Sequence, residues 1–234
     1  MDRLQFIATL TTAATVPAAK LRGGAIAGVP IPASAFAAEA TAIAIAAESP
    51  EVFAHSLRTF LFAELLARAS GIEHDAEAVY VASILHDAGL SPRYMSDRRR
   101  FEVDGAFLAL DLCKKYNLAG ARSNIIWDAV ALHDQGEIAR FKQPEVALVN
   151  AGVATDFGAH LDTLKKDDIV AVLLAAPRSN FVPVFLNTVA AYVKRKPLAT
   201  GNSWITDIGY RMVPGFHLNN FVDAVKDDPF EAYH

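Results

Sequence analysis

The feature that most constrains the fold is a mostly apolar run that ends in two ionisable residues. The run extends from Val79 to Leu85, and His86 and Asp87 follow it directly. A segment of this kind is normally buried, and two adjacent ionisable side chains are costly to bury without partners. A divalent cation would satisfy both, through an imidazole nitrogen and a carboxylate oxygen. The alternative is a buried histidine hydrogen-bonded to a neighbour, with Asp87 exposed at a helix end.

The pattern around this run predicts an all-α chain. Apolar or amphipathic segments separated by glycine and proline predict helices over residues 35–47, 50–69, 75–87, 101–116, 123–132, 145–157, 167–176 and 178–195. Ser34, Asp75, Ser123 and Asp167 are the predicted N-caps, and Gly71 and Gly89 the predicted helix ends. Strand signals are weak throughout, because no alternating apolar run is flanked by turn residues.

Three regions follow from this pattern. Residues 1–48 form an irregular arm, with one short helix near its start, followed by the first long helix. Residues 49–176 form the metal-binding domain, and residues 177–234 a C-terminal helix and a tail that wraps the domain, with a short helix near Asn220–Val225. The length of 234 residues, 53 % of them hydrophobic, allows one domain with a large core.

Charge and cysteine content exclude several functions. A net charge of −4 argues against a nucleic-acid binder, and no apolar run reaches the ~18 residues of a membrane span. The single cysteine, Cys113, excludes an internal disulfide or a thiolate zinc site and favours the cytoplasm. Arg93 and residues 98–100 form the one dense basic cluster. It is either a solvated loop or a source of guanidinium groups for an anionic substrate.

Further ionisable residues lie inside apolar helices, as the His86-Asp87 pair does. They are His55, His133 and Asp156. Asp156 follows the apolar segment 146–154, so the helix would carry it into the core, where an unpaired carboxylate costs several kcal/mol. Two histidines and two aspartates from three helices would make a site for one metal ion, with room for water.

The order His55, His86-Asp87, Asp156 resembles the H…HD…D pattern of the HD-domain superfamily of metal-dependent hydrolases and lyases. More narrowly, the chain resembles the cyanamide hydratase-like branch, through the segments 55–58 (HSLR), 85–90 (LHDAGL), 100–106 (RFEVDGA), 127–133 (WDAVALH) and 152–156 (GVATD). The resemblance implies a single all-α HD-domain bundle in which His55, His86, Asp87 and Asp156 bind one divalent metal. Zinc is the first choice because hydration needs no redox change, and Fe²⁺ or Mn²⁺ are alternatives.

The chain departs from two other HD patterns. Dinuclear members place two further histidines between the HD pair and the last aspartate, whereas this sequence has only His133 there. Leu90 stands where some HD phosphodiesterases carry a lysine, three residues after the aspartate. The first departure argues against a two-metal phosphodiesterase or a diiron oxygenase. The second argues against phosphate chemistry, which usually needs such a positive charge.

The resemblance therefore implies a metal-dependent hydro-lyase or hydrolase. A metal-bound hydroxide would attack an electrophilic carbon of a small nitrile- or amide-like substrate, as when cyanamide becomes urea. His133 would protonate the developing nitrogen anion, and Asp87 would accept a proton while it binds the metal. Arg58 would contact the substrate or support a ligand. Glu102 would either stabilise the start of its helix or orient a ligand.

Two other interpretations stay open. One is a phosphohydrolase acting on a nucleotide or a small phosphorylated metabolite. This interpretation is favoured if the basic cluster folds over the metal. The other is a sensor or interaction module that keeps the fold for its shape. The expected partner is a small-molecule substrate, without nucleic acid or membrane, and a homodimer is a base-rate expectation for a helical enzyme of this size.

Overall fold

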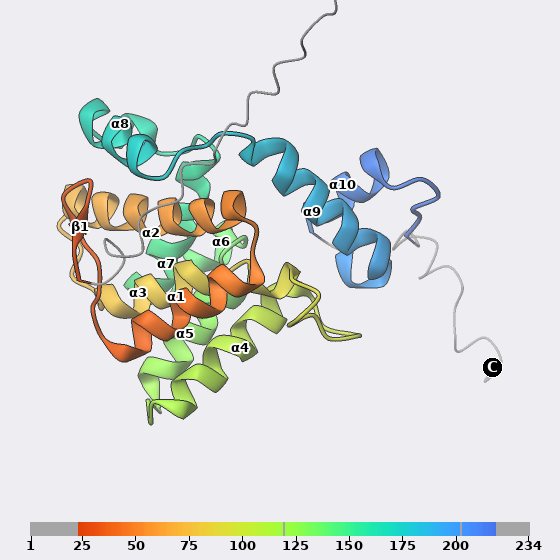
Figure 1. The fold of residues 1–234 in the computed structure, drawn as a ribbon, viewed down its shortest axis with the longest axis horizontal. Helices are drawn as coiled ribbons and strands as arrows, with labels where there is room; N and C mark the ends of the chain where they lie inside the picture. Colours follow the sequence, from red (N-terminus) through yellow and green to blue (C-terminus); the bar gives the residue numbers. More distant parts are fainter. Residues whose placement is uncertain (1–22, 119, 202, 219–234) are drawn as a thin grey trace, which may run out of the picture.

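The computed structural model describes residues 23–118, 120–201 and 203–218 (Figure 1). It is built almost entirely from helices, so the all-α prediction is confirmed. Among the described residues, β structure is limited to an antiparallel pair of two-residue strands, β1 (Ala25–Ile26) and β2 (Val29–Pro30). The short helices predicted near the start of the chain and near Asn220–Val225 lie outside the described residues. The region boundaries at residues 48 and 176 stay predictions.

The helices follow one another with short connections. They are α1 (Ala35–Ala47), α2 (Pro50–Ser70), α3 (Ala76–Leu85), α4 (Phe101–Lys115), α5 (Ala121–Ala131), α6 (Gly136–Ala139), α7 (Pro144–Asp156), α8 (Lys166–Ala175), α9 (Phe181–Arg195) and α10 (Ile205–Met212). Three 3₁₀ turns, η2 (Ala88–Leu90), η3 (Leu161–Thr163) and η4 (Pro197–Thr200), lie between them. Figure 1 shows α1 to α7 gathered into a bundle, with α9 and α10 standing at one side of it.

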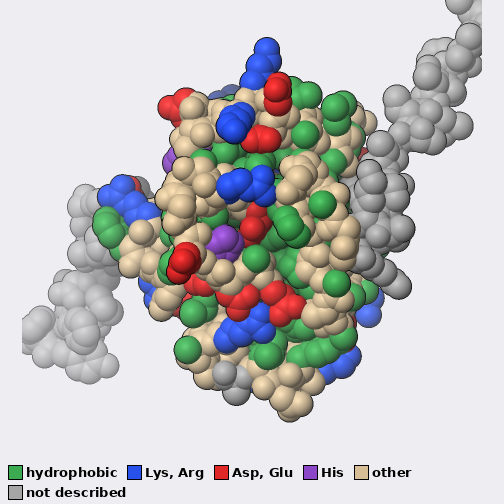
Figure 2. Space-filling model, turned by 90° about the vertical axis from the view of Figure 1, so that its left-hand side faces the viewer, with side chains coloured by type: hydrophobic (Ala, Val, Ile, Leu, Met, Phe, Trp, Pro, Cys, Tyr) green, Lys and Arg blue, Asp and Glu red, His purple; other side chains and the backbone are tan. Residues whose placement is uncertain are grey.

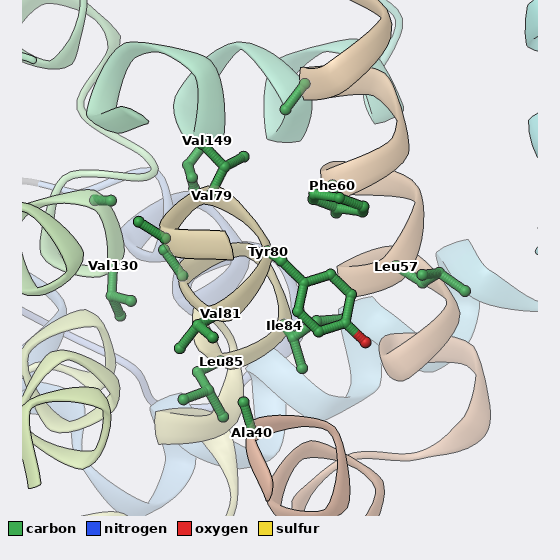
Figure 3. Packing of buried hydrophobic residues seen from close by; sticks show 14 of the residues in the cluster. Ala40, Leu57, Phe60, Val79, Tyr80, Val81, Ile84, Leu85, Val130 and Val149 are labelled. Carbon is green, nitrogen blue, oxygen red and sulfur yellow. The ribbon is translucent and has the colours of Figure 1, made fainter. Parts of the chain in front are cut away.

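Helix α3 is the centre of the bundle. Every residue from Ala78 to Leu85 is buried, and α1, α2, α4, α5 and α7 all pack against this helix. Figure 3 shows its side chains facing neighbours on several sides, and the Tyr80 ring meets Phe60 of α2 edge to face at 4.9 Å. A helix covered all round needs apolar residues all round, which explains the apolar run in the sequence.

The predicted helix ends are confirmed where capping chemistry is local. The Ser34 hydroxyl and the Asp75 carboxylate accept hydrogen bonds from backbone N–H groups of the helices they precede. Gly71 ends α2 in the left-handed conformation, with φ of 65°, which a glycine adopts without strain. Helix α3 ends at Leu85, so His86 and Asp87 lie in the turn after it, not inside the helix. The predicted helix end at Gly89 is wrong, because Gly89 lies within η2.

Two predicted N-caps are wrong. Ser123 lies inside α5, where its hydroxyl donates to the Gly120 carbonyl, and Gly120 is the cap. Asp167 lies in the first turn of α8, and Lys165 precedes that helix as its cap. In both places the helix begins after a residue two or three positions earlier, Lys165 with an extended backbone and Gly120 with a positive φ of 79°, so the polar side chain falls within the helix.

The C-terminal region is more regular than predicted. Helix α9 begins at Phe181, not Arg178, and Pro183 falls in its first turn as expected. Helix α10 was not predicted, because the sequence after Pro197 mixes glycine, proline and aromatic residues without a clear period. Its residues Ile205 and Ile208 are buried against α9, which stabilises it.

A second apolar cluster attaches this region to the bundle. Buried side chains of α9 and α10 pack with Val52 of α2, Leu90 of η2 and Phe101 of α4. The described residues include no helix whose length and apolar character would let it cross a membrane.

Candidate metal centre and cavity

Three buried side chains converge at one point. His55 comes from α2, and His86 and Asp87 from the turn after α3. Nε2 of His55 lies 3.2 Å from Nε2 of His86 and 3.7 Å from Oδ2 of Asp87. Nε2 of His86 lies 3.3 Å from the same oxygen. The structure thus brings together three of the four residues predicted to bind the metal.

The hydrogen bonds show which atoms face the centre. Nδ1 of His86 donates to the Ser83 carbonyl at 2.7 Å, and Nδ1 of His55 donates to the Asp156 carboxylate at 2.7 Å. In the neutral rings both Nε2 atoms therefore carry lone pairs, which would repel at 3.2 Å. Oδ2 of Asp87 is buried and has no hydrogen-bond partner among the described residues. A divalent cation would satisfy all three atoms, so these residues fit a metal ion.

The protonation states suit metal binding. Burial opposes the charge of Asp87, but the adjacent His86 outweighs it and lowers the pKa of the carboxyl. Burial lowers the pKa of His55. Burial also tends to lower the pKa of His86, but the Asp87 carboxylate outweighs burial and raises the pKa of the ring. A proton on His86 and a metal ion would therefore compete for the same nitrogen.

Asp156 holds His55 from the opposite side. Its Oδ2 accepts from His55 and from Nη2 of Arg58 at 2.9 Å. Its Oδ1 accepts from Nε of Arg58 at 2.8 Å and pairs with Nη1 of Arg178 at 2.6 Å. Both oxygens are thus occupied, and the contacts are those of a carboxylate that orients a ligand histidine. The role of Asp156 as a fourth ligand stays a prediction.

A glycine explains why Asp156 meets His55. Gly152 lies against the backbone of α2, where an added Cβ would come within 2.2 Å of the Thr59 carbonyl oxygen. Asp156 follows Gly152 by one helical turn, and His55 precedes Thr59 by one turn. The close approach of α2 and α7 at Gly152 therefore places the two ionisable side chains in contact.

Arg58 supports the site from behind and does not line the cavity. Its side chain is fully buried, and Nη1 donates to the carbonyls of Ala176 and Pro177 at 3.2 and 3.0 Å. The guanidinium lies over the Phe181 ring at 5.0 Å. Of the two roles predicted for Arg58, substrate contact and support of a ligand, these contacts match the second.

A cavity of about 540 Å³ lies over the converging side chains. His55, His86, Asp87 and His133 line one part of it. The remaining lining comes mostly from hydrophobic side chains of α7, α9 and the α10 region: Val153, Phe157, Val182, Phe185, Leu186, Trp204 and Ile208, with Asp134 and Asp207. Of the residues that the structure describes, no lysine or arginine lines this cavity.

His133 is brought to the cavity as predicted. Its Nδ1 donates to the Val130 carbonyl at 2.7 Å, which leaves the lone pair on Nε2. Its ring meets His86 edge to face, with centroids 4.7 Å apart. Burial, and then the charge of His86, lower the pKa of His133 to about 4. The ring is therefore neutral near pH 7, and its Nε2 lone pair faces no hydrogen-bond donor among the described residues.

Glu102 does not line the cavity but supports a residue that does. It lies in the first turn of α4, pairs with Arg100 and is almost fully buried. Burial raises the pKa of Glu102 to about 7 and outweighs the Arg100 contact. Arg100 also reaches Asp134 at 3.5 Å, and Asp134 accepts from Nε1 of Trp204 at 3.0 Å. Glu102 is therefore linked to the cavity through Arg100, Asp134 and Trp204.

The predicted basic cluster does not fold into the cavity. Arg93 lies over the ring of Tyr94, and Arg99 pairs with Asp104 at 3.2 Å. Arg100 faces Glu102 and Asp134. None of residues 98–100 is among the lining residues.

Sequence reasoning missed the apolar wall and the second arginine at Asp156. The spacing of four between Phe181, Phe185 and Val189 marks a one-sided helix and could have predicted a buried face on α9. Trp204 precedes a helix that was not expected. Arg178 was seen only as the start of a helix, and no local pattern links it to Asp156.

The comparison with known families agrees with this geometry. Residues 52–156 match the family model of the HD domain. The matched segment contains the three converging residues, His133 and, at its last position, Asp156. HD-domain proteins are metal-dependent hydrolases, so the match supports an enzyme of that broad class. No curated protein matches the chain, and the HD match does not reach the level of the cyanamide hydratase-like branch.

Proposed function

Because residues 52–156 match an HD domain, we propose that the chain is a metal-dependent hydratase or hydrolase acting on an electrophilic carbon. Its substrate is an uncharged nitrile- or amide-like molecule, as in the cyanamide hydratase-like branch. The observation that carries the proposal is the meeting of two imidazole nitrogens and an unpartnered carboxylate oxygen beside a cavity whose described lining has no lysine or arginine.

His55, His86 and Asp87 would hold the metal, with zinc as the first choice and Fe²⁺ or Mn²⁺ as alternatives. A bound divalent cation lowers the pKa of water from ~15.7 towards ~7 and polarises the substrate. Asp156 keeps His55 in the tautomer with its lone pair on Nε2, and the Ser83 carbonyl does the same for His86.

His133 moves the proton. Hydration of a nitrile breaks the two C–N π bonds and the two O–H bonds of water, and forms a C=O double bond and two N–H bonds, so both protons pass from oxygen to nitrogen. The neutral Nε2 of His133 accepts a proton from the attacking water and returns it to the nitrogen of the substrate. Asp87 lies close enough to His86 and the cavity to share the proton released by water.

A phosphohydrolase is the alternative that the HD match leaves open. A phosphate dianion in this cavity would meet the carboxylates of Asp134 and Asp207 and no guanidinium from the described residues. On the face shown in Figure 2, lysine and arginine side chains lie beside aspartate and glutamate, so that face carries no continuous basic surface. The lining of the cavity favours an uncharged substrate.

The test is metal analysis joined to two activity assays. The purified protein is loaded with Zn²⁺, Fe²⁺ or Mn²⁺ in turn. Each form is assayed for urea from cyanamide, amide from nitriles and carboxylate from amides, and separately for phosphate from nucleoside monophosphates. We expect one bound metal per chain and turnover of a nitrile or amide.

The matched control is His86→Ala, which removes one converging nitrogen. It should lose metal and turnover while circular dichroism stays helical. Phosphate release that depends on His86, without turnover of any nitrile or amide, would contradict the proposal and establish the alternative.

A further inference from the structure

Resting on the proposed function, we infer that the substrate carries an uncharged apolar body, aromatic or branched aliphatic, attached to the reacting nitrile or amide carbon. The apolar body lies against Phe185, Leu186 and Trp204, and the reacting carbon lies beside His133 and Asp87. Cyanamide itself would then be a poor substrate, because it fills little of the cavity.

The size of the cavity supports this inference. At about 540 Å³ it falls within the roughly 300–1,000 Å³ of cavities that take drug-sized ligands. A three-heavy-atom molecule such as cyanamide would leave most of the hydrophobic lining in contact with water. Burying that lining against an apolar group releases the water and gives binding energy in proportion to the area covered.

The lining combines a polar cluster with a hydrophobic wall beside it. Two imidazoles and a carboxylate lie where His55, His86 and Asp87 converge. Phe185 lies against His55 with ring centroids 5.9 Å apart, and it stacks on Trp204 with centroids 5.9 Å apart and planes 17° apart. A ligand that fits both parts has one polar group and one apolar body.

The lining also disfavours a charged body. The ionisable groups facing the cavity are acids and histidines, and Arg58 and Arg178 are both paired with Asp156. A carboxylate or phosphate on the body would be repelled by Asp134 and Asp207. The body therefore carries no anionic group, and the mostly hydrophobic lining disfavours burial of a cationic group as well.

Binding tests the inference without relying on turnover. The chain has two tryptophans, so Trp127→Phe leaves Trp204 as a fluorescent reporter in the cavity wall. The zinc-loaded variant is titrated with benzamide, with acetamide, which lacks the ring, and with phenyl phosphate, which keeps the ring but carries charge. We expect benzamide to bind at least ~10-fold more tightly than either, the lower end for a missing methylene in an apolar pocket.

Any one of three binding results would overturn the inference. Benzamide at millimolar concentration could leave the Trp204 emission unchanged. Acetamide could bind as tightly as benzamide, or phenyl phosphate could bind as tightly as benzamide or more tightly. Each can occur whether or not the enzyme hydrates nitriles, so the inference can fail while the proposed function stands.

Turnover gives the second measurement. We expect kcat/KM for benzonitrile or isovaleronitrile to exceed that for cyanamide or acetonitrile by at least ~10-fold. Equal or better turnover of the small nitriles would overturn the inference and leave the proposed function intact. Phosphate release without nitrile or amide turnover would overturn the proposed function. The titrations with benzamide, acetamide and phenyl phosphate would then show separately whether the cavity binds an apolar body.

Leu186→Trp tests whether the apolar body of the substrate contacts the wall formed by α9. The larger side chain on α9 should fill part of the cavity, raise KM for benzonitrile by at least ~10-fold and leave metal content unchanged. Leu174→Trp is the matched control, because Leu174 is 78 % exposed on α8 and does not line the cavity. An unchanged KM for benzonitrile in Leu186→Trp would exclude this wall.

Discussion

The carboxylate of Asp156 accepts the Nδ1–H of His55 at 2.7 Å while it binds the Nε and Nη2 groups of Arg58. Asp156→Asn should loosen this arrangement, because the amide cannot accept from His55 and Arg58 without turning an N–H towards one of them. We expect metal affinity to fall ~10–100-fold, the range for partners that orient a ligand histidine. Metal titration of the variant measures this, and unchanged affinity would show that His55 needs no such support.

Arg58→Lys should destabilise the protein although charge is kept. Lysine cannot form the forked pair with Asp156 and also reach the carbonyls of Ala176 and Pro177. Because hydrogen bonds to charged groups contribute ~1.5–3 kcal/mol each, the free energy of unfolding should fall by ~2 kcal/mol or more. Urea unfolding checks this. Arg68→Lys on the same helix is the control, since exposed Arg68 makes one bond to the Gly28 carbonyl.

His133→Ala should separate metal binding from turnover. His133 lines the cavity but lies outside the three-residue cluster, so metal content should stay at the wild-type level. Loss of a general acid–base group should lower kcat by ~10²–10⁴-fold. His217→Ala is the control, because His217 is exposed. Full turnover by His133→Ala would remove this residue from the mechanism.

Glu102 makes stability depend on pH. Its pKa is raised from 4.5 to about 7 in the folded protein, so between these values the folded state holds a proton that the unfolded state releases. The contribution of Glu102 to the free energy of unfolding is therefore greatest below pH ~4.5. It is lost as pH rises through about 7, and the loss is up to roughly 3 kcal/mol. Glu102→Gln should flatten this slope in urea unfolding between pH 5 and 8, and exposed Glu137→Gln should not.

Gly152→Ala tests the contact that places Asp156 beside His55. The new Cβ would come within 2.2 Å of the Thr59 carbonyl, so α2 and α7 must separate. We expect a loss of ~1–3 kcal/mol in thermal or urea unfolding, together with weaker metal binding. Gly201→Ala is the control, because its Cβ would meet nothing within 4 Å. Equal stability of the two variants would show that the helices adjust freely.

Much of the fold was predictable because the signals are local. The spacing of apolar residues, the caps Ser34 and Asp75 and the helix end at Gly71 depend on neighbours in sequence, and all are confirmed. Ser123 and Asp167 failed as caps because several polar residues stood near each helix start. Helix α10 depends on burial against α9, which sequence spacing does not reveal.

The site also has parts that could be predicted from the sequence and parts that could not. The meeting of His55 with the His86-Asp87 pair was predicted from the family resemblance and from the cost of burying charge. The two arginines at Asp156 could not be predicted, because Arg58 on α2 and Arg178 in the segment between α8 and α9 lie far from it in sequence. The cavity wall likewise requires the position of α9 over α7, which is a property of the packed molecule.

The residues that precede α9 are tied to the same carboxylate that steadies His55. Arg58 binds the carbonyls of Ala176 and Pro177, and Arg178 pairs with Asp156. Helix α9 carries the hydrophobic wall and follows directly. Variants in the segment 176–178 will therefore affect both the position of the hydrophobic wall and the support of His55, so that evolution must adjust selectivity and metal retention together.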